Sequence, residues 1–191
     1  MNILLSALRK ESEYKKLAES ATKGGRYLVT GISDSLYALS VASLFKDTKR
    51  KIVAIFPDEK DAISLSGELQ SFGVRCLTLP SRDFFFGKVD ARGHDFDYLR
   101  LSALSQIADG EWDILATTAE AFCQTTVPRD TLISSRLEIK SGDFTDIEIL
   151  SKKLSDMGYK RCELVDGKGQ FSKRGGIVDV YPTQLDYPVR I

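Results

Sequence analysis

Apolar positions in the first two thirds of the chain fall into short, wholly apolar runs and longer runs with helical spacing. The short runs predict strands at residues 26–30, 51–56, 74–79 and 112–117. The longer runs predict helices at residues 3–20, 34–45, 58–72 and about 95–108. Runs without alternation, such as Ile52 to Phe56, are typical of parallel strands covered by helices on both faces. The pattern therefore predicts an α/β fold with an open parallel sheet and right-handed crossovers.

The pattern changes after Pro128, where the predicted elements become shorter and more closely spaced. We expect a strand at 136–140, a helix at 146–157, and strands at 160–165, 170–173, 177–181 and 187–191. Short strands this close together form antiparallel meanders. The sequence therefore predicts an α/β domain at residues 1–128 and a smaller α+β domain with an antiparallel sheet at residues 129–191. We expect the second domain to continue beyond Ile191, because its last strand reaches the end of the sequence.

Composition and charge exclude several classes of function. Lys and Arg together number 27, and Asp and Glu together also number 27, so there is no chain-wide positive field to bind nucleic acid. Three cysteines without a C-x-x-C pair indicate neither a disulfide framework nor a zinc knuckle, which favours a cytoplasmic protein. The single histidine, His94, excludes a multi-histidine metal site, and we expect it to be solvated or to cap a helix. No segment is apolar enough to predict a membrane span.

The turn from Gly31 to Ala38 occupies the position of a phosphate-binding loop, between a predicted strand and a helix. A working loop reads G-x-x-x-x-G-K-[ST], in which glycine, lysine and a hydroxyl group hold the phosphates and magnesium. Counting from Gly31, these positions are Leu36, Tyr37 and Ala38, and the carboxylate of Asp34 would repel a nucleotide. We therefore expect a degenerate phosphate loop that binds no nucleotide, with no catalytic residue and no cofactor in this chain.

Two other clusters are expected to be structural. The aromatic run Phe84 to Phe86 lacks interleaved basic residues, so core packing or docking against a neighbouring domain is favoured over base stacking. The carboxylates of Asp58, Glu59 and Asp61 open a predicted helix, where capping and the helix dipole explain them.

The segment from Lys160 to Gly175 has a local excess of positive charge, with five basic and two acidic residues. Arginine forms bidentate pairs with carboxylates, and arginines beside aromatic residues such as Phe171 and Tyr181 are enriched in interface hot spots. The segment predicts binding to a protein partner with an acidic surface. A solvated sheet face is the plainer alternative, and direct binding of double-stranded DNA through residues 160–174 is a further one.

The C-terminal sequence resembles a known family. The segments MGYKR (157–161), GQFSKRGGIVDVYP (169–182) and YPVRI (187–191) are similar to the N-terminal UvrB-like module of the bacterial transcription-repair coupling factor (Mfd) family. Upstream segments fall in the same order, so the resemblance covers nearly the whole chain. UvrB is the nearer alternative, but UvrB has an intact phosphate loop and a long β-hairpin for which residues 123–135 leave no room.

The resemblance implies a degenerate, RecA-like helicase fold for the first domain and a second domain that docks onto UvrA, the damage-recognition protein of nucleotide excision repair. Arg174 and Arg190 match the arginines that face UvrA in this family. Candidates added to them from the same segment are Arg161, Lys173, Phe171 and Tyr181.

The resemblance also implies which functions lie elsewhere. Full-length family members are ATP-dependent DNA translocases that bind RNA polymerase and double-stranded DNA through other domains, so ATP and Mg²⁺ are implied only for those domains. The resemblance thus indicates a non-catalytic module that recruits UvrA to couple stalled transcription to repair. The alternative is a nucleotide-dependent, UvrB-like enzyme domain of the helicase superfamily, against which Leu36, Tyr37 and Ala38 argue.

Overall fold

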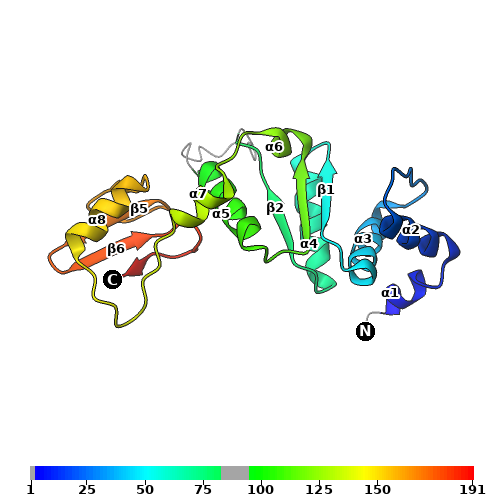
Figure 1. Cartoon of the computed structure of the whole chain (residues 1–191), viewed down its shortest axis with the longest axis horizontal. Helices are drawn as coiled ribbons and strands as arrows, with labels where there is room; N and C mark the ends of the chain where they lie inside the picture. Colours follow the sequence, from blue (N-terminus) through cyan, green and yellow to red (C-terminus); the bar gives the residue numbers. More distant parts are fainter. Residues whose placement is uncertain (1–2, 83–94) are drawn as a thin grey trace. The chain divides into compact units, whose positions relative to one another are not determined.

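A computed structural model of the chain describes residues 3–82 and 95–191 (Figure 1). The chain forms two compact units, one of Met1–Ser81 with Gly110–Gln124 and one of Arg82–Asp109 with Thr125–Ile191. Residues 95–109 thus group with residues 125–191. The expected domains 1–128 and 129–191 stay a prediction.

The first unit is built around a parallel sheet. Its strands are β1 (Ile52–Phe56), β2 (Cys76–Leu79) and β3 (Ile114–Thr118). Its helices are α1 (Ile3–Leu8), α2 (Ser12–Lys23), α3 (Asp34–Thr48), α4 (Glu59–Ser71) and α6 (Ala119–Cys123). The described strands lie in the order β1-β3-β2, with β3 parallel to both neighbours and buried along its whole length. The predicted α/β class, with a parallel sheet flanked by helices, is confirmed.

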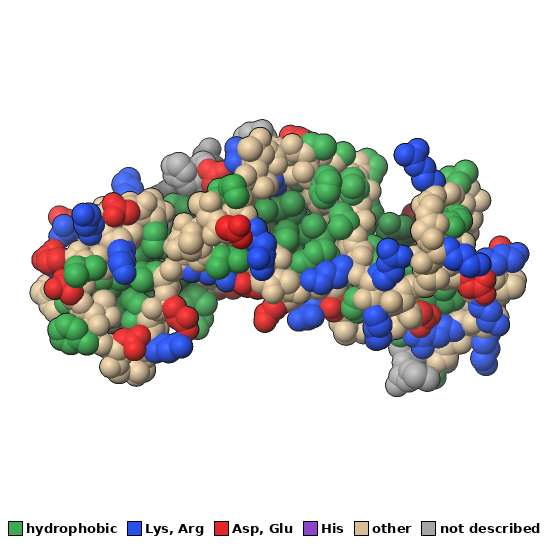
Figure 2. Space-filling model, in the orientation of Figure 1, with side chains coloured by type: hydrophobic (Ala, Val, Ile, Leu, Met, Phe, Trp, Pro, Cys, Tyr) green, Lys and Arg blue, Asp and Glu red, His purple; other side chains and the backbone are tan. Residues whose placement is uncertain are grey.

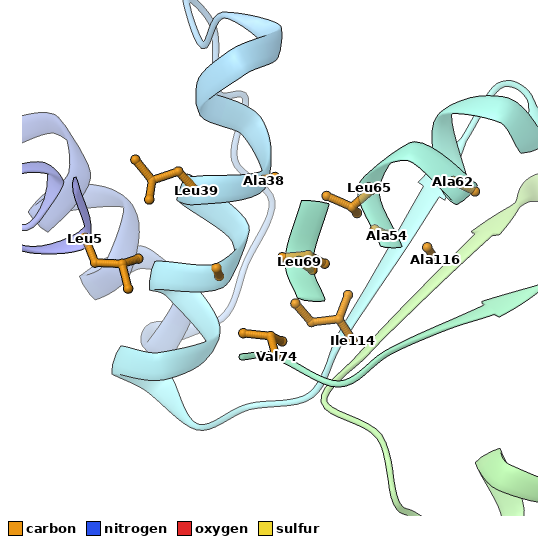
Figure 3. Close-up of a cluster of buried hydrophobic side chains, with 11 residues drawn as sticks. Leu5, Ala38, Leu39, Ala54, Ala62, Leu65, Leu69, Val74, Ile114 and Ala116 are labelled. Carbon is orange, nitrogen blue, oxygen red and sulfur yellow. The ribbon is translucent and has the colours of Figure 1, made fainter. Parts of the chain in front are cut away.

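The core of this unit lies where α4 packs on the sheet and α3 packs against α4 (Figure 3). Leu65 and Leu69 of α4 and Ile114 of β3 are at most 3% exposed. The other buried members are Leu5, Ala38, Leu39, Ala42, Ala54, Ala62, Val74 and Ala116. Many of these side chains are small, so the helices can approach the sheet closely. Hydrophobic side chains also gather on the surface over the three-stranded sheet (Figure 2).

Residues at one end of α4 and one end of α2 help to set where these helices begin and end. The side chain of Asp58 accepts a hydrogen bond from the Asp61 N–H at 3.0 Å, which caps α4 as expected. The α2 helix ends at Lys23 before Gly24, whose φ of 77° lies in the region that favours glycine.

The N-terminal helix expected at 3–20 is instead two helices, α1 and α2, separated by residues 9–11. Tyr14 donates a hydrogen bond to the Asp47 carboxylate of α3 at 2.6 Å, and Arg9 pairs with the same carboxylate. A break between the helices lets both side chains reach one acceptor, which helical spacing alone does not reveal.

The strand expected at 26–30 is absent from the sheet. These residues form an irregular segment, in which Tyr27, Leu28 and Val29 are about half to nine tenths exposed. The predicted strand is wrong because a strand needs a ladder partner, and the described strands pair only with one another. Residues 26–30 therefore have the apolar composition of a strand but no hydrogen-bonded partner strand.

The second unit combines helices with a separate sheet. Its helices are α5 (Asp95–Asp109), α7 (Arg129–Ser134) and α8 (Ile147–Asp156). Its strands are β4 (Lys160–Arg161), β5 (Gln170–Arg174), β6 (Ile177–Tyr181) and β7 (Val189–Arg190), in that spatial order. The β5-β6 and β6-β7 pairs are antiparallel as expected, but β4 runs parallel to β5. The sheet is therefore mixed, because the loop at 162–169 carries the chain back to the start of β4.

The core of the second unit lies between α8 and the mixed sheet. Leu150 and Leu154 of α8 are at most 3% exposed. They pack with Phe171, Val178 and Val180 of the sheet. The expected strand at 136–140 is wrong, because these residues have no strand pairing. The alternation of apolar residues in this segment nevertheless indicated which side chains are partly buried, since Leu137 and Ile139 pack against this core.

Candidate functional site

The register of the second sheet divides its residues between two faces. Successive side chains of a strand point to opposite faces, and the pairs Phe171–Val180 and Lys173–Val178 lie on the face that packs against α8. The residues on the other face include Gln170, Ser172, Arg174, Ile177, Asp179, Tyr181 and Arg190. We call this second set the arginine face, because it carries both arginines that the family resemblance singled out.

Arg190 and Asp179 form a two-pronged ion pair on the arginine face. The two residues are direct cross-strand partners on β7 and β6. Arg190 donates from Nε to Asp179 Oδ1 at 2.6 Å and from Nη2 to Oδ2 at 3.0 Å. The Arg190 side chain is 68% exposed and that of Asp179 is 21% exposed. These hydrogen bonds lower the pKa of Asp179 and raise that of Arg190.

Arg174 lies at the other end of this face, at the C-terminal end of β5. Its Nη2 donates to the backbone carbonyl of Glu163, which also accepts from Ser172 Oγ at 3.1 Å. The shared carbonyl ties the exposed guanidinium to the loop that follows β4. A surface cavity of about 470 Å³ opens beside it, lined by Arg161, Cys162, Glu163, Ser172, Lys173 and Arg174.

The remaining candidates from the basic segment do not all share the arginine face. Lys173 points toward α8, pairs with Glu148 and is only 19% exposed. Phe171 is fully buried. Truncating such a residue costs about 3–5 kcal/mol, so a binding defect on its removal would report the loss of the core. Arg161 is exposed at the cavity.

Tyr181 lies on the arginine face but is half-buried at its edge. Its hydroxyl donates to the backbone carbonyl of Asp186 at 2.9 Å. The Asp186 carboxylate in turn accepts from Lys168 at 3.0 Å. Tyr181 therefore anchors the loop between β6 and β7, which carries the chain to Arg190.

Charges of both signs are interspersed over the second unit. In the view of Figure 2, basic and acidic side chains alternate over α8 and the mixed sheet. Some of these charges are paired, since Lys168, Lys173 and Arg190 each have a carboxylate partner. This pairing reduces the local basic excess of the sequence, which favours recognition of individual carboxylates over binding to a phosphate backbone.

Cys162 lines the cavity beside Arg174 but has the properties of a structural thiol. Its Sγ lies 3.5 Å from the Phe171 carbonyl oxygen and 3.6 Å from Gln170 Oε1. Burial and the nearby Asp166 raise the pKa of its thiol. A raised pKa disfavours the nucleophilic thiolate.

The turn considered as a degenerate phosphate loop belongs to the first unit. It follows the irregular segment rather than a strand, and α3 begins at Asp34 as expected. Ala38 is 2% exposed and packs in the core, and the Tyr37 ring meets Phe56 edge-on at 5.8 Å. The side chains that replace the lysine and hydroxyl of a working loop therefore serve packing. That Gly31 to Ala38 bind no nucleotide stays a prediction.

Two sequence-based expectations, those for His94 and for Phe84 to Phe86, lie outside the described residues. Among residues 3–82 and 95–191, no group of three or more His, Cys, Asp or Glu side chains could hold a metal ion. None of the described helices is both long and apolar enough to cross a membrane.

Sequence reasoning missed Asp179, which pairs with Arg190 at the site. Its only signal was its place as the single charged residue of the strand IVDVY. A charge at an alternating position of a strand indicates an exposed face, but its partner depends on a register that the sequence does not show.

Comparisons with known proteins agree with the resemblance. The UvrB interaction domain family matches residues 137–191, the part of the chain that contains the arginine face. Over its whole length the chain is 24% identical to a transcription-repair-coupling factor of Bacillus subtilis and 23% identical to one of Staphylococcus aureus. It is 26% identical over 166 residues to that of Staphylococcus epidermidis. The chain spans 14–16% of the length of these relatives. The resemblance to the UvrB-like module of transcription-repair coupling factors is thereby confirmed.

Proposed function

We propose that this chain is the non-catalytic N-terminal module of a transcription-repair coupling factor and that its arginine face recruits UvrA. The observation that carries the proposal is that the family match and the two arginines fall in the same part of the chain. The UvrB interaction domain matches residues 137–191, and within them the exposed side chains of Arg174 and Arg190 lie on one sheet face. In this proposal, other domains of the full-length protein bind RNA polymerase and double-stranded DNA. Because these partners are cytoplasmic in bacteria, the module would also act in the cytoplasm.

The chemistry of the face suits a protein partner with exposed carboxylates. Guanidinium groups bind carboxylates with two parallel hydrogen bonds, and such pairs carry specificity as well as affinity. Arg174 and Arg190 are both exposed, and each is held at one side by the protein. An acidic patch on UvrA could therefore engage two arginines whose positions are already restricted.

The proposal assigns no nucleotide chemistry to this chain. Leu36 and Tyr37 offer no charge to a phosphate, and Ala38 is buried. In this proposal, ATP and Mg²⁺ act only in other domains of the full-length protein.

Isothermal titration calorimetry of the full chain with purified UvrA tests the proposal. The variants are Arg174→Ala and Arg190→Ala, with Lys152→Ala as a matched control. Lys152 is exposed on α8, on the opposite side of the sheet, so its removal changes net charge equally without touching the arginine face. A separate titration with ATP tests the enzyme alternative.

We expect binding in the micromolar range or tighter, weakened more than about tenfold by either arginine substitution and little changed by Lys152→Ala. No binding by a folded chain, or equal weakening by all three substitutions, would contradict the proposal. Heat of ATP binding would instead support the nucleotide-dependent alternative.

A further inference from the structure

Asp179 stands between the two arginines of the face. It pairs with Arg190 on β7 across one side of β6, and its neighbour across the other side is Ser172 on β5, two residues from Arg174. Arg190 is the main cause of the lowered pKa of Asp179, and the charge of Arg174 adds to it. The Asp179 carboxylate is therefore hydrogen-bonded to Arg190 and lies within the electrostatic influence of Arg174.

The ion pair uses only one edge of the Arg190 guanidinium. A guanidinium offers two edges for a carboxylate, one of Nε with a terminal nitrogen and one of both terminal nitrogens. Asp179 occupies the Nε–Nη2 edge. Among the described residues, Nη1 has no acceptor, so the Nη1–Nη2 edge is left for a partner. The side chain is 68% exposed, which makes that edge accessible.

The backbone on either side of Arg190 is also fixed. Ile191 donates to the Val178 carbonyl at 2.9 Å and accepts from the Val178 N–H at 3.0 Å. Val189 packs against the core below the sheet. With the backbone paired and both Nε and Nη2 held by Asp179, the side chain has less rotational freedom than an unpaired arginine.

We propose that Asp179 is a positioning residue, which holds Arg190 so that its Nη1–Nη2 edge meets a carboxylate of UvrA. This inference rests on the proposed function and extends it to a residue that makes no contact with the partner. Binding by a preorganised side chain avoids much of the entropy loss of ordering it. Asp179 therefore favours an acidic partner although it is itself acidic.

The positioning role and simple charge attraction predict opposite effects on UvrA affinity when the Asp179 carboxylate is removed. If the partner responds only to net positive charge, then removing the Asp179 carboxylate should strengthen binding. If Asp179 competes with the partner for Arg190, the same change should also strengthen binding. Only the positioning role predicts that binding weakens.

The test measures binding of the full chain to purified UvrA for Asp179→Asn, Asp179→Glu and Asp186→Asn, and for Asp179→Asn combined with Arg190→Ala. Asp186→Asn is the matched control, since its exposed carboxylate lies in the same unit and pairs with Lys168 rather than with an arginine. Thermal melts of each variant report whether the fold is retained.

We expect Asp179→Asn to weaken binding about three- to tenfold, the range expected from ordering one long side chain. Asp179→Glu should restore part of this loss, and Asp186→Asn should leave binding unchanged or slightly stronger. In the Arg190→Ala background, Asp179→Asn should have no further effect. Unchanged or tighter binding of Asp179→Asn, or an equal loss in both backgrounds, would overturn the inference.

Failure of the proposed function gives a different result, because the wild-type chain would then not bind UvrA and the inference would fall with it. A second measurement requires neither a partner nor a variant. In the free chain, the ¹⁵Nε–H relaxation of Arg190 should show an ordered side chain. An Nε–H as mobile as that of an unrestrained arginine would overturn the positioning role even if Asp179→Asn failed to fold.

Discussion

Tyr98 of α5 lies so close to Gly169 that a Cβ atom on the glycine would come within 2.3 Å of the tyrosine hydroxyl oxygen. Gly169 also has a φ of 74°, which favours glycine. It directly precedes β5, and its N–H donates to the Tyr181 carbonyl at 2.9 Å. The absence of a side chain thus lets α5 pack against the start of the strand that ends at Arg174.

We predict that Gly169→Ala destabilises the protein by about 2–4 kcal/mol, because the clash with Tyr98 adds to the backbone strain. Urea unfolding measures the change. Gly158→Ala is the matched control, since Gly158 has a φ of 87° but open space around its Cβ position. Equal losses for the two variants would show that the contact with Tyr98 contributes nothing. Replacing Tyr98 with alanine should make the Gly169→Ala change less costly.

The two basic neighbours Lys173 and Arg174 should differ sharply in binding. Lys173 points toward α8 and pairs with Glu148, whereas Arg174 is exposed on the arginine face. We predict that Lys173→Met changes UvrA affinity by less than about twofold, while Arg174→Met weakens it more than about tenfold. Methionine keeps the aliphatic stem in both cases. Calorimetry measures the difference, and similar effects would mean that net charge rather than face decides binding.

The sequence was most informative where local interactions set the structure. Capping by Asp58 and the apolar spacing of Leu150 and Leu154 involve residues within a few positions of one another, and α4 and α8 were predicted within about two residues. Pairing between distant segments could not be derived in this way. The segment 26–30 has a strand-like composition but no ladder partner, and the parallel β4-β5 pairing depends on how the loop at 162–169 closes.

In the candidate site, too, features that depend on pairing between strands could not be predicted. Arg174 and Arg190 were identified from family resemblance, and nothing in the residue pattern alone separated them from Lys173 and Phe171. Strand alternation separates neighbours such as Lys173 and Arg174 only once the strand bounds and register are known. The Asp179–Arg190 pair joins residues eleven positions apart through that register, so it became visible only in the structure.

A buried carboxylate in the first unit leads to a stability prediction. Glu59, at the start of α4, is 7% exposed, and its Oε1 accepts the backbone N–H of Ser81 at 2.6 Å. We predict that Glu59→Ala destabilises the protein by about 1–3 kcal/mol, because it leaves a buried N–H without its acceptor. Glu59→Gln keeps a carbonyl oxygen and should cost less. Thermal unfolding measures both, and an equal loss would show that the negative charge, rather than the acceptor, matters.

The ion pair between Arg75 and Asp113 predicts how stability depends on pH. Arg75 Nη2 donates to Asp113 Oδ1 at 3.0 Å, and the Arg75 backbone N–H donates to Oδ2 at 3.0 Å. Partial burial acts to raise the pKa of Asp113, but the hydrogen bonds from Arg75 outweigh it, so the pKa is lowered. A lowered pKa in the folded state means that the ionised carboxylate stabilises the fold above about pH 4, the ordinary range of an aspartate. This contribution is lost as the pH falls through the folded-state pKa.

We predict that Asp113→Asn destabilises the protein by about 1 kcal/mol at pH 7, a value reduced by the exposure of Arg75. The difference from wild type should shrink as the pH falls below about 4, because wild-type Asp113 then becomes protonated and neutral like the variant. Urea unfolding at pH 7, 5 and 3 measures this. Glu111→Gln is the control, since Glu111 is exposed and affects Arg75 only through its charge. A difference that stays constant across this pH range would show that the side-chain amide replaces the carboxylate without any role for ionisation.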